Sequence, residues 1–242
     1  MDLLEDLGLG SGTTAVVGAG GKKTTIYSVA PRIGRAVVTS TVRIPIFDEH
    51  VADVRTTRDP LAALRAVEKW PIGLVPERED TRYLGYDPAV VSEMAEQGTA
   101  DAILVKADGA RNREFKAPGE NEPRIPDGAD RVLVFASVHV VGEPLDEELV
   151  HRPERVRDIT GRDLGEPVQA EDVARVLASE RGGLKNVPEG AEVIPVLNKV
   201  DDDDLEATAR SIAERVLAES PIERVALARM IDPERPLVDI VS

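Results

Sequence analysis

Cysteine is absent from this chain of 242 residues, and aromatic residues make up only 3% of it. Without cysteine there is no disulfide framework, no thiolate nucleophile, no Cys-ligated zinc and no iron–sulfur cluster. No apolar run approaches the ~20 residues that span a bilayer. Residues 2–6 (DLLED) are acidic and lack the basic region of a secretory signal. We therefore expect a cytoplasmic protein that does not associate with a membrane.

Lysine is scarce as well. The 30 basic residues are 23 Arg and 7 Lys, against 45 acidic residues, and the net charge is −15. Such a surface repels a phosphate backbone, so we expect no nucleic-acid partner. The acidity fits either an interaction surface or adaptation to a salty cytoplasm, where salt screens the repulsion between carboxylates. Because the acids are spread along the whole chain, we favour a halophilic composition.

Short runs of Val, Ile and Leu alternate with helical patterns. We expect strands over 13–17, 36–39, 72–75, 102–105, 131–138, 193–197 and 224–228, and helices over 23–32, 61–69, 88–98, 169–181 and 204–219. Asp59-Pro60 and Asp87-Pro88 are expected helix starts, with Asp as the N-cap and Pro at the first position. Unbroken apolar strands between helices are typical of a parallel sheet covered on both faces. The predicted fold is a three-layer α/β/α sandwich with a mostly parallel sheet, like that of P-loop NTPases. We expect one nucleotide-binding domain over residues 1–242, with 143–183 as a helical lobe or lid.

A glycine-rich segment, VVGAGGKKTT at residues 16–25, follows the first predicted strand and opens a helix. Glycines allow backbone amides to approach an anion, and a helix N-terminus with a lysine adds positive charge. The loop is one residue shorter than G-x-x-x-x-G-K-[ST], so either lysine can be the phosphate ligand, and a plain turn remains the alternative. The candidate nucleotide ligands here are Gly18, Ala19, Gly20, Gly21, Lys22, Lys23, Thr24 and Thr25.

Asp108 follows the strand predicted over 102–105. A carboxylate at the carboxyl end of a core strand lies at the edge where open α/β sheets bind ligands. Together with Thr24 or Thr25 it would hold the Mg²⁺ that accompanies a nucleotide. The alternative is that Asp108-Gly109 is only a turn.

The sequence Asn198-Lys199-Val200-Asp201 follows a late strand and matches N-K-x-D, a guanine-reading motif. Asp201 would accept hydrogen bonds from guanine, Lys199 would lie along the base, and Asn198 would brace the loop. Adenine lacks those donors and would leave the carboxylate unpaired, which favours GTP over ATP. The alternative is that these residues cap the following helix.

Polar groups in three further segments complete the candidate site. Thr39 and Thr41 end the second predicted strand and are assigned to the nucleotide. The long loop over 111–126 and the histidine motif near 151 are assigned to a substrate, because long irregular loops are usually functional or mobile. The candidate substrate residues are Arg113, Lys116, Glu122, His151 and Arg152.

Taken together, these motifs resemble the YqeC-type family, which is regarded as accessory to selenium-dependent molybdenum hydroxylases. The family patterns V-G-A-G-G-K-T-T, T-T-T-T-K-I, E-A-D-G-A, K-A-P with E-P-x-I-P, H-R-P and N-K-x-D correspond to Val17–Thr24, Thr39–Ile44, Lys106–Ala110, Lys116–Pro126, His151–Pro153 and Asn198–Asp201. The resemblance implies a P-loop-type fold and a role in maturing a selenium-containing molybdenum cofactor. In this chain Lys106 replaces an acid and Lys23 a hydroxyl, and both changes place a cation near the expected metal.

Three functions are compatible with the resemblance and the residues. The first is a GTP or ATP hydrolase that drives a step of cofactor maturation. The second is a module that binds or delivers a nucleotide-containing molybdenum cofactor without hydrolysis, which the two substituting lysines favour. The third is a small-molecule kinase or transferase. The expected partners are a nucleotide and a molybdenum hydroxylase or its cofactor-maturation proteins.

Overall fold

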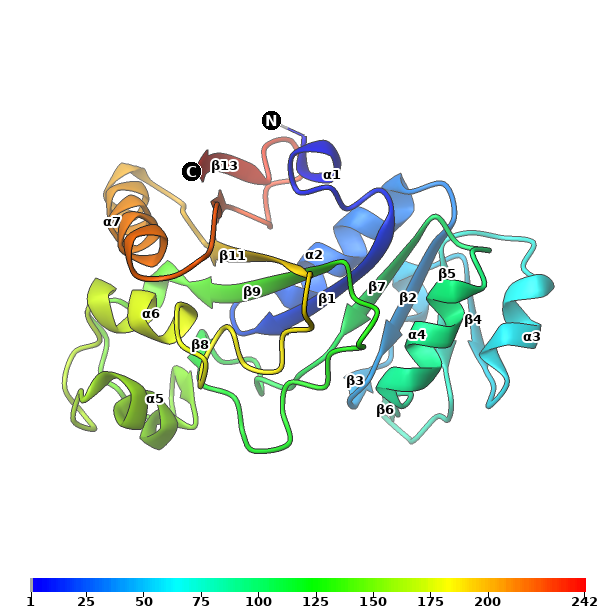
Figure 1. Ribbon diagram of the computed structural model, residues 1–242, viewed down its shortest axis with the longest axis horizontal. Helices are drawn as coiled ribbons and strands as arrows, with labels where there is room; N and C mark the ends of the chain where they lie inside the picture. The colour runs from blue at the N-terminus through cyan, green and yellow to red at the C-terminus, as the bar shows by residue number, and fades with distance from the viewer. Residues whose placement is uncertain (1) are drawn as a thin grey trace.

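A nine-stranded sheet runs through the centre of the computed structural model, which describes residues 2–242 (Figure 1). Its order is β13-β12-β11-β9-β1-β7-β2-β5-β4, and every neighbouring pair is parallel except β12–β13. The strands of this sheet are β1 (Gly12–Gly18), β2 (Ala36–Ser40), β4 (Asp53–Thr56), β5 (Ile72–Val75), β7 (Ala102–Lys106), β9 (Arg131–Ser137), β11 (Glu192–Asn198), β12 (Val225–Ala228) and β13 (Leu237–Val241). The predicted mostly parallel sheet is confirmed.

Two short strand pairs lie outside the main sheet. One joins β3 (Ile44–Pro45) to β6 (Arg82–Tyr83), and the other joins β8 (Phe115–Lys116) to β10 (Val150–His151). The α-helices are α1 (Leu3–Asp6), α2 (Lys22–Val29), α3 (Pro60–Arg65), α4 (Pro88–Glu96), α5 (Pro153–Thr160), α6 (Ala170–Leu177) and α7 (Asp203–Glu219). No helix within residues 2–242 combines the length and the apolar character that crossing a membrane requires.

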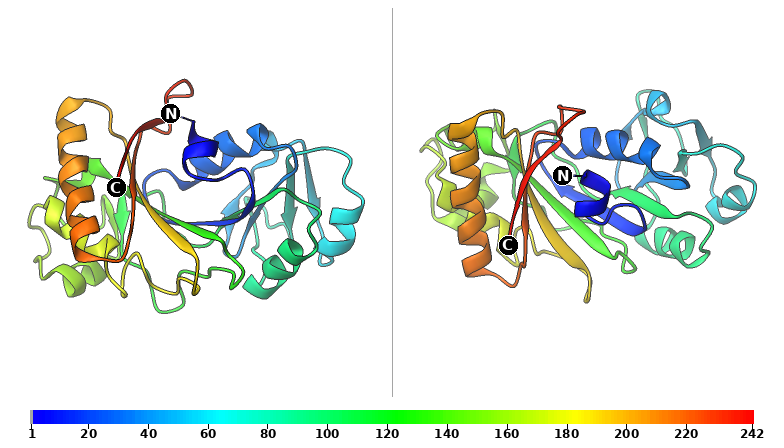
Figure 2. Two further views of the ribbon diagram at one scale, coloured as in Figure 1. Left: turned by 45° about the horizontal axis from the view of Figure 1, so that its top comes forward. Right: turned by 90° about the horizontal axis from the view of Figure 1, so that it is seen from above.

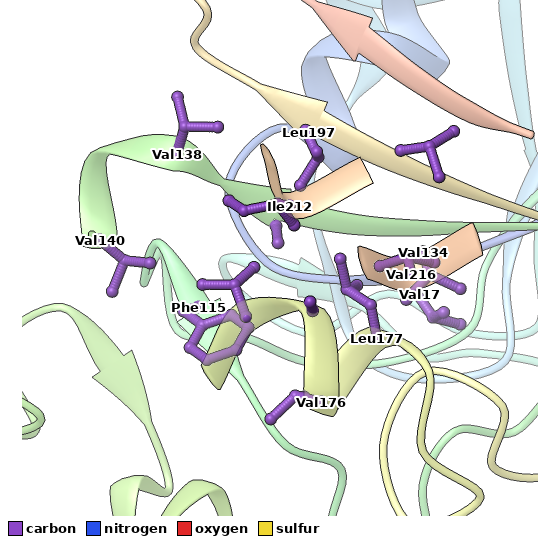
Figure 3. Packing of buried hydrophobic residues seen from close by; sticks show 14 of the residues in the cluster. Val17, Phe115, Val134, Val138, Val140, Val176, Leu177, Leu197, Ile212 and Val216 are labelled. Atoms are coloured by element: carbon purple, nitrogen blue, oxygen red, sulfur yellow. The ribbon is translucent and has the colours of Figure 1, made fainter. Parts of the chain in front are cut away.

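Alternation along the strands sends side chains to two separate cores, one on each face of the sheet. Val16 packs with α1 and α2 on one face. Ala15 and Val17 point the other way, where α5, α6 and α7 supply the opposing side chains (Figure 3). Helices α3 and α4 cover the β2–β5–β7 part of the sheet through a third cluster that contains Leu64 and Met94. Helices on both faces give the three layers that the sequence predicts.

Strand β1 lies in the middle of the sheet, at the point where the order of strand addition reverses. After β1 the chain builds β2, β4, β5 and β7 on one side, and from β9 onward it builds the other side. Ligands of open α/β sheets bind at such a switch point, outside the carboxyl ends of the strands. The topology therefore directs attention to the loop that follows β1.

The two ends of the chain lie close together, over the face that α1 and α2 cover (Figure 2). Leu3, Leu7 and Leu237 belong to one buried cluster. The Arg224 guanidinium donates a 2.6 Å hydrogen bond to the Asp6 carbonyl.

Several elements differ from the sequence-based expectation. The seven predicted strands are present, but β4 and β13 were not predicted. The strand over 224–228 is therefore not the last one, because β13 pairs with it as an antiparallel edge strand. Both Asp-Pro starts are confirmed: Asp59 and Asp87 accept hydrogen bonds from Ala62 and Ala89. The helix predicted over 61–69 ends early, at Arg65, and helix α6 ends at Leu177 rather than at residue 181.

Candidate functional site

The loop from β1 to α2 is built so tightly that two of its positions require glycine. Gly18 has φ 89°, and a Cβ there would lie 2.1 Å from the Phe135 carbonyl oxygen. Gly21 has φ 147°, and a Cβ there would lie 2.2 Å from Asn198 Nδ2. Gly21 is also the N-cap of α2, so no side chain caps the first turn of that helix. The loop thus brings backbone close to its neighbours and leaves the helix start without a side-chain cap.

The two lysines after the loop have different surroundings. Lys22 is 6% exposed, and its ammonium donates to the Gly18 carbonyl and to Asp108 Oδ1. Lys23 is partly exposed and reaches Asn112 Oδ1 at 3.4 Å. Lys22 is therefore the lysine that lies inside the loop.

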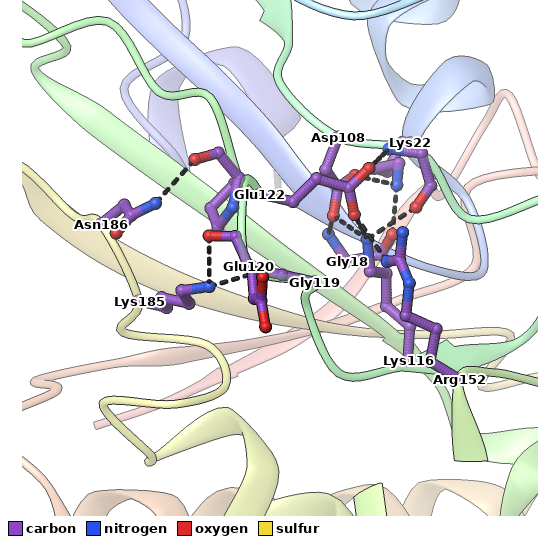
Figure 4. Close-up of polar contacts among 12 residues, drawn as sticks. Gly18, Lys22, Asp108, Lys116, Gly119, Glu120, Glu122, Arg152, Lys185 and Asn186 are labelled. Carbon is purple, nitrogen blue, oxygen red and sulfur yellow. Dashed lines mark hydrogen bonds and ion pairs between the residues drawn. The ribbon is translucent and has the colours of Figure 1, made fainter. Parts of the chain in front are cut away.

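Asp108 is the centre of a buried ion network (Figure 4). Its Oδ2 accepts a 2.8 Å hydrogen bond from the Gly18 amide and lies 2.9 Å from Lys116 Nζ. Lys116 Nζ also lies 3.0 Å from Glu122 Oε2, and the Arg152 guanidinium donates to the same oxygen at 2.7 Å. Burial alone would raise the pKa of Asp108, but the Lys22 and Lys116 ammonium groups hold it below its usual value. Asp108 is thus an ionised counter-charge for two lysines.

This arrangement does not suit Asp108 as a ligand that faces the cleft. Its side chain is 2% exposed, and both oxygens already have cationic partners. A divalent cation would meet two ammonium groups there, and like charges repel. Thr24 is exposed on the first turn of α2 and lines the cleft, whereas the Thr25 hydroxyl is buried and donates to the Gly21 carbonyl. Within residues 2–242 no cluster of three His, Asp or Glu residues could hold a metal on its own.

A cleft of about 900 Å³ opens along the carboxyl edge of the sheet. This volume is near the upper end of the ~300–1,000 Å³ typical of small-molecule sites. The predicted residues that line it are Gly20, Gly21, Lys22, Lys23, Thr24, Arg113, Glu122, His151, Arg152, Asn198, Lys199 and Asp201. Twelve predicted residues from four segments of the chain thus meet in one cavity.

The other predicted residues lie behind that lining. The floor of the loop and the ion network are formed by Gly18, Ala19, Thr25, Asp108 and Lys116. The two threonines of the second strand are fully buried and serve the fold instead: Thr39 donates to the Leu74 carbonyl at 2.7 Å and Thr41 to the Arg124 carbonyl at 2.6 Å. Thr39 and Thr41 are not among the residues that line the cleft.

Asn198 joins the glycine loop to the far edge of the sheet. Its Nδ2 donates to the Gly20 carbonyl at 2.7 Å, and its Oδ1 accepts from the Met230 amide at 3.0 Å. Asp201 lies in the cleft with Oδ2 3.1 Å from His139 Nε2. Helix α7 is capped by Asp202, whose Oδ1 accepts from the Leu205 amide. Capping therefore does not account for Asp201.

Positive side chains dominate the cleft. Those that line it are Lys22, Lys23, Arg43, Arg82, Lys106, Arg111, Arg113, Arg152, Lys199 and Arg229. The carboxylates among the described lining residues are Glu114, Glu122 and Asp201. In a chain of net charge −15, this concentration of cations makes the cleft a specific attractor for anions.

Some of these lining residues were not among the sequence candidates. Arg82, His139 and Arg229 reach the cleft from β6, from the end of β9 and from the turn after β12. His139 comes directly after the strand predicted over 131–138, and this place at a strand end is the sequence signal that could have identified it as a site residue. Nothing in the sequence places Arg82 beside Pro45, its partner in the β3–β6 pair.

Burial lowers the pKa of three basic residues of the cleft. For Lys22 the nearby Asp108 carboxylate opposes this effect. Burial lowers the pKa of Lys106 to about 7, with a further contribution from the nearby Lys22 charge. Burial also lowers the pKa of His151 to about 4, and Arg152 and Lys116 add to the effect. At neutral pH His151 is therefore uncharged, and Lys106 is only partly charged.

A family profile described as "YqeC protein" matches residues 14–154. The uncharacterized protein YqeC of Escherichia coli strain K12 is 30% identical over 205 residues, which covers 81% of this chain and 80% of that protein. Among solved structures, HypB from Helicobacter pylori in complex with nickel aligns with a TM-score of 0.40 and 13% identity, covering 95% of this chain and 84% of HypB.

Proposed function

The chain belongs to the YqeC family, and we propose that it is a nucleotide-binding accessory protein whose ligand lies in the cleft at the carboxyl edge of the sheet. One observation carries this proposal. An uncapped helix start and a buried lysine follow the central strand, at the switch point of the sheet, and open into a cation-rich cleft. Helix N-termini of this kind bind phosphate groups.

We assign the phosphate chain to the loop over 18–22. The Lys22 ammonium now donates to Asp108, and a bound phosphate oxygen would compete for it. Asp108 keeps Lys116 and the Gly18 amide as partners when Lys22 turns to the phosphate. The exchange therefore leaves no uncompensated charge behind the loop, which lowers its cost.

We assign the base to Asp201 and the guanine nucleotides to this site. The Asp201 side chain is 41% exposed, within the cleft, and does not cap α7. Lys199 lines the same end and is held by Glu114 Oε1 at 2.6 Å, while Asn198 fixes the loop to Gly20. This arrangement supports N-K-x-D recognition of guanine, with the base taking the place of His139 at Asp201 Oδ2.

The family resemblance supports a role in the maturation of a selenium-dependent molybdenum hydroxylase or its cofactor. A second candidate function is binding and delivery of a nucleotide-containing molybdenum cofactor without hydrolysis. The position of Asp108 favours this candidate, because two lysines hold the carboxylate that Mg²⁺-dependent hydrolysis would use. The pyrophosphate of such a cofactor would occupy the same loop.

Two measurements test the proposed function. The purified protein is denatured, and any released small molecule is identified by mass spectrometry. GTP, GDP and ATP are then titrated into the full chain by calorimetry. We expect guanine nucleotides to bind at least about tenfold more tightly than ATP, a difference of ~1.4 kcal/mol. The absence of saturable binding by all three nucleotides, and of any co-purified nucleotide-containing molecule, would refute the proposal.

A further inference from the structure

We propose that the half of the cleft on the β2 side of the glycine loop is a second binding site, for a small multiply charged oxyanion that lies beside the nucleotide. The ligand class is a compact phosphate-bearing or carboxylate-bearing molecule. The inference rests on the proposed function only in assigning the other half of the cleft to the nucleotide.

The sheet order separates the two halves. Along the carboxyl edge, β11 with Asn198 and Asp201 lies two strands from β1 on one side, and β2 lies two strands from β1 on the other. Neighbouring strands are about 4.8 Å apart, so each half extends roughly 10 Å from the glycine loop. A nucleotide with its phosphates on the loop and its base at Asp201 occupies the β11 half. The β2 half of the same cleft stays outside that path.

Charge distinguishes the β2 half. Its cationic side chains are Arg43 directly before β3, Arg82 in β6, Lys106 at the end of β7, and Arg152 beside Glu122. Arg43 also pairs with Glu79 at 3.0 Å, and Lys106 is only partly charged at neutral pH. Glu122 is the acid that lines it within the described chain, and Lys116 and Arg152 already neutralise that carboxylate. Clustered like charges raise the energy of the empty site, and a bound anion relieves the repulsion. Because guanidinium groups match planar and tetrahedral oxyanions with paired hydrogen bonds, arginine suits phosphate and carboxylate ligands.

Lys106 adds a buried donor to this half. Its residue is 6% exposed, and its ammonium donates to the Arg43 carbonyl at 3.0 Å. That is one of the three hydrogen bonds that a lysine can donate. The pairing of Val16 with Lys106 across β1 and β7 puts Lys106 on the α2 face of the sheet, next to the glycine loop. A ligand held by Lys106 would therefore lie close to the phosphate end of the nucleotide.

Backbone strain marks the lining of the whole cleft. The lining residues with a positive φ and a side chain are Arg111, Asn112, Arg152 and Lys199, with φ of 50°, 60°, 64° and 66°, in the left-handed region that such residues rarely adopt. Strain of this kind persists only where the surroundings enforce it, and it clusters at ligand sites.

The test uses the full chain saturated with a non-hydrolysable GTP analogue, at constant ionic strength. Pyrophosphate and citrate are titrated in separate arms, which separate phosphate from carboxylate chemistry. Three proteins are compared: the wild type, Arg82→Ala, and Arg65→Ala as a matched control. Arg65 is an exposed arginine at the end of α3, outside the cleft, so it removes the same charge from elsewhere.

We expect at least one anion to bind the nucleotide-loaded wild type. Arg82→Ala should weaken that anion at least about tenfold and weaken the GTP analogue by a clearly smaller factor, and Arg65→Ala should change neither. Absence of anion binding to the loaded wild type, equal loss in both arginine variants, or displacement of the GTP analogue by the anion would each overturn the second site. If no nucleotide binds at all, the same titration on the ligand-free chain tests the second anion site separately from the nucleotide site. Anion binding that depends on Arg82 then supports this site although the nucleotide assignment has failed.

Discussion

Lys22, in the first turn of α2, and Asp108, just beyond the end of β7, form one buried ion pair although 86 positions separate them. Their side chains are 6% and 2% exposed. The pair joins the loop after the central strand to the neighbouring strand. It also keeps the Lys22 ammonium at the mouth of the site that we assign to phosphate.

The first prediction distinguishes the two adjacent lysines. Lys22→Met should lower GTP affinity at least about tenfold, because a charge-assisted hydrogen bond contributes ~1.5–3 kcal/mol. Lys23→Met is the matched control and should lower it less than threefold (under ~0.7 kcal/mol). Calorimetric titration gives both values, and urea unfolding shows whether Lys116 alone compensates Asp108. A larger loss in Lys23→Met than in Lys22→Met would reverse the assignment.

The second prediction concerns the base. Asp201→Asn replaces an acceptor with a donor, so GTP affinity should fall at least about tenfold while xanthosine triphosphate gains. Asp202→Asn keeps the cap of α7, since Asn caps as well as Asp, and should leave nucleotide preference unchanged. Competition titrations with the two nucleotides measure the switch. Equal effects of the two substitutions would argue against guanine reading by Asp201.

The third prediction is a pH dependence of stability. The pKa of Lys106 is about 7 in the folded chain and ordinarily 10.5, so the unfolded chain binds more protons between these values. Raising the pH from 7 to 9 should therefore raise the free energy of unfolding, by up to ~1.4 kcal/mol per pH unit from this group. Lys106→Met should flatten the slope. Denaturant unfolding at both pH values measures it, and identical slopes in wild type and variant would contradict the buried-amine interpretation.

The fourth prediction concerns magnesium. Because Lys116 and the Gly18 amide stay on Asp108 when Lys22 turns to the phosphate, chelation with EDTA should reduce GTP affinity less than about tenfold, or under ~1.4 kcal/mol. The control is the same titration with sodium chloride matched to the ionic strength of the magnesium buffer. A loss of a hundredfold or more on chelation would mean that Asp108 exchanges its lysines for the metal.

Local signals predicted most of the fold. The parallel strands were visible as continuous apolar runs, and Asp59 and Asp87 as N-caps, because each depends on neighbours in the sequence. Strand β13 alternates only weakly and is an edge strand, and β4 is short and largely polar, so neither has the pattern of a buried strand. These two elements are defined by pairing, which a single sequence does not show.

The candidate site was predicted as a set of segments but not as a set of contacts. The glycine loop, Asn198 and Asp201 do meet at one edge of the sheet. By contrast, Lys116 was assigned to a substrate, and in the fold it pairs with Asp108. The hydroxyl groups of Thr39 and Thr41 were assigned to the nucleotide, but they donate hydrogen bonds to backbone carbonyls instead. Long-range partners of this kind follow from topology, so composition and spacing do not reveal them. The metal role, the base and the pathway stay predictions.

The Asn198 side chain connects the Met230 amide to the glycine loop, so hydrogen exchange at Met230 depends on the state of that loop. The Met230 amide proton is held by Asn198 Oδ1, while the other end of that side chain holds the Gly20 carbonyl. A ligand that fixes the loop reduces the opening that releases this proton, so deuterium uptake at Met230 should slow when the loop is filled. The Ala52 amide donates to the Pro71 carbonyl at 2.8 Å outside the cleft, and exchange at Ala52 provides the comparison. Occupancy can thus be followed by mass spectrometry at a backbone position that belongs to neither the loop nor its ligand.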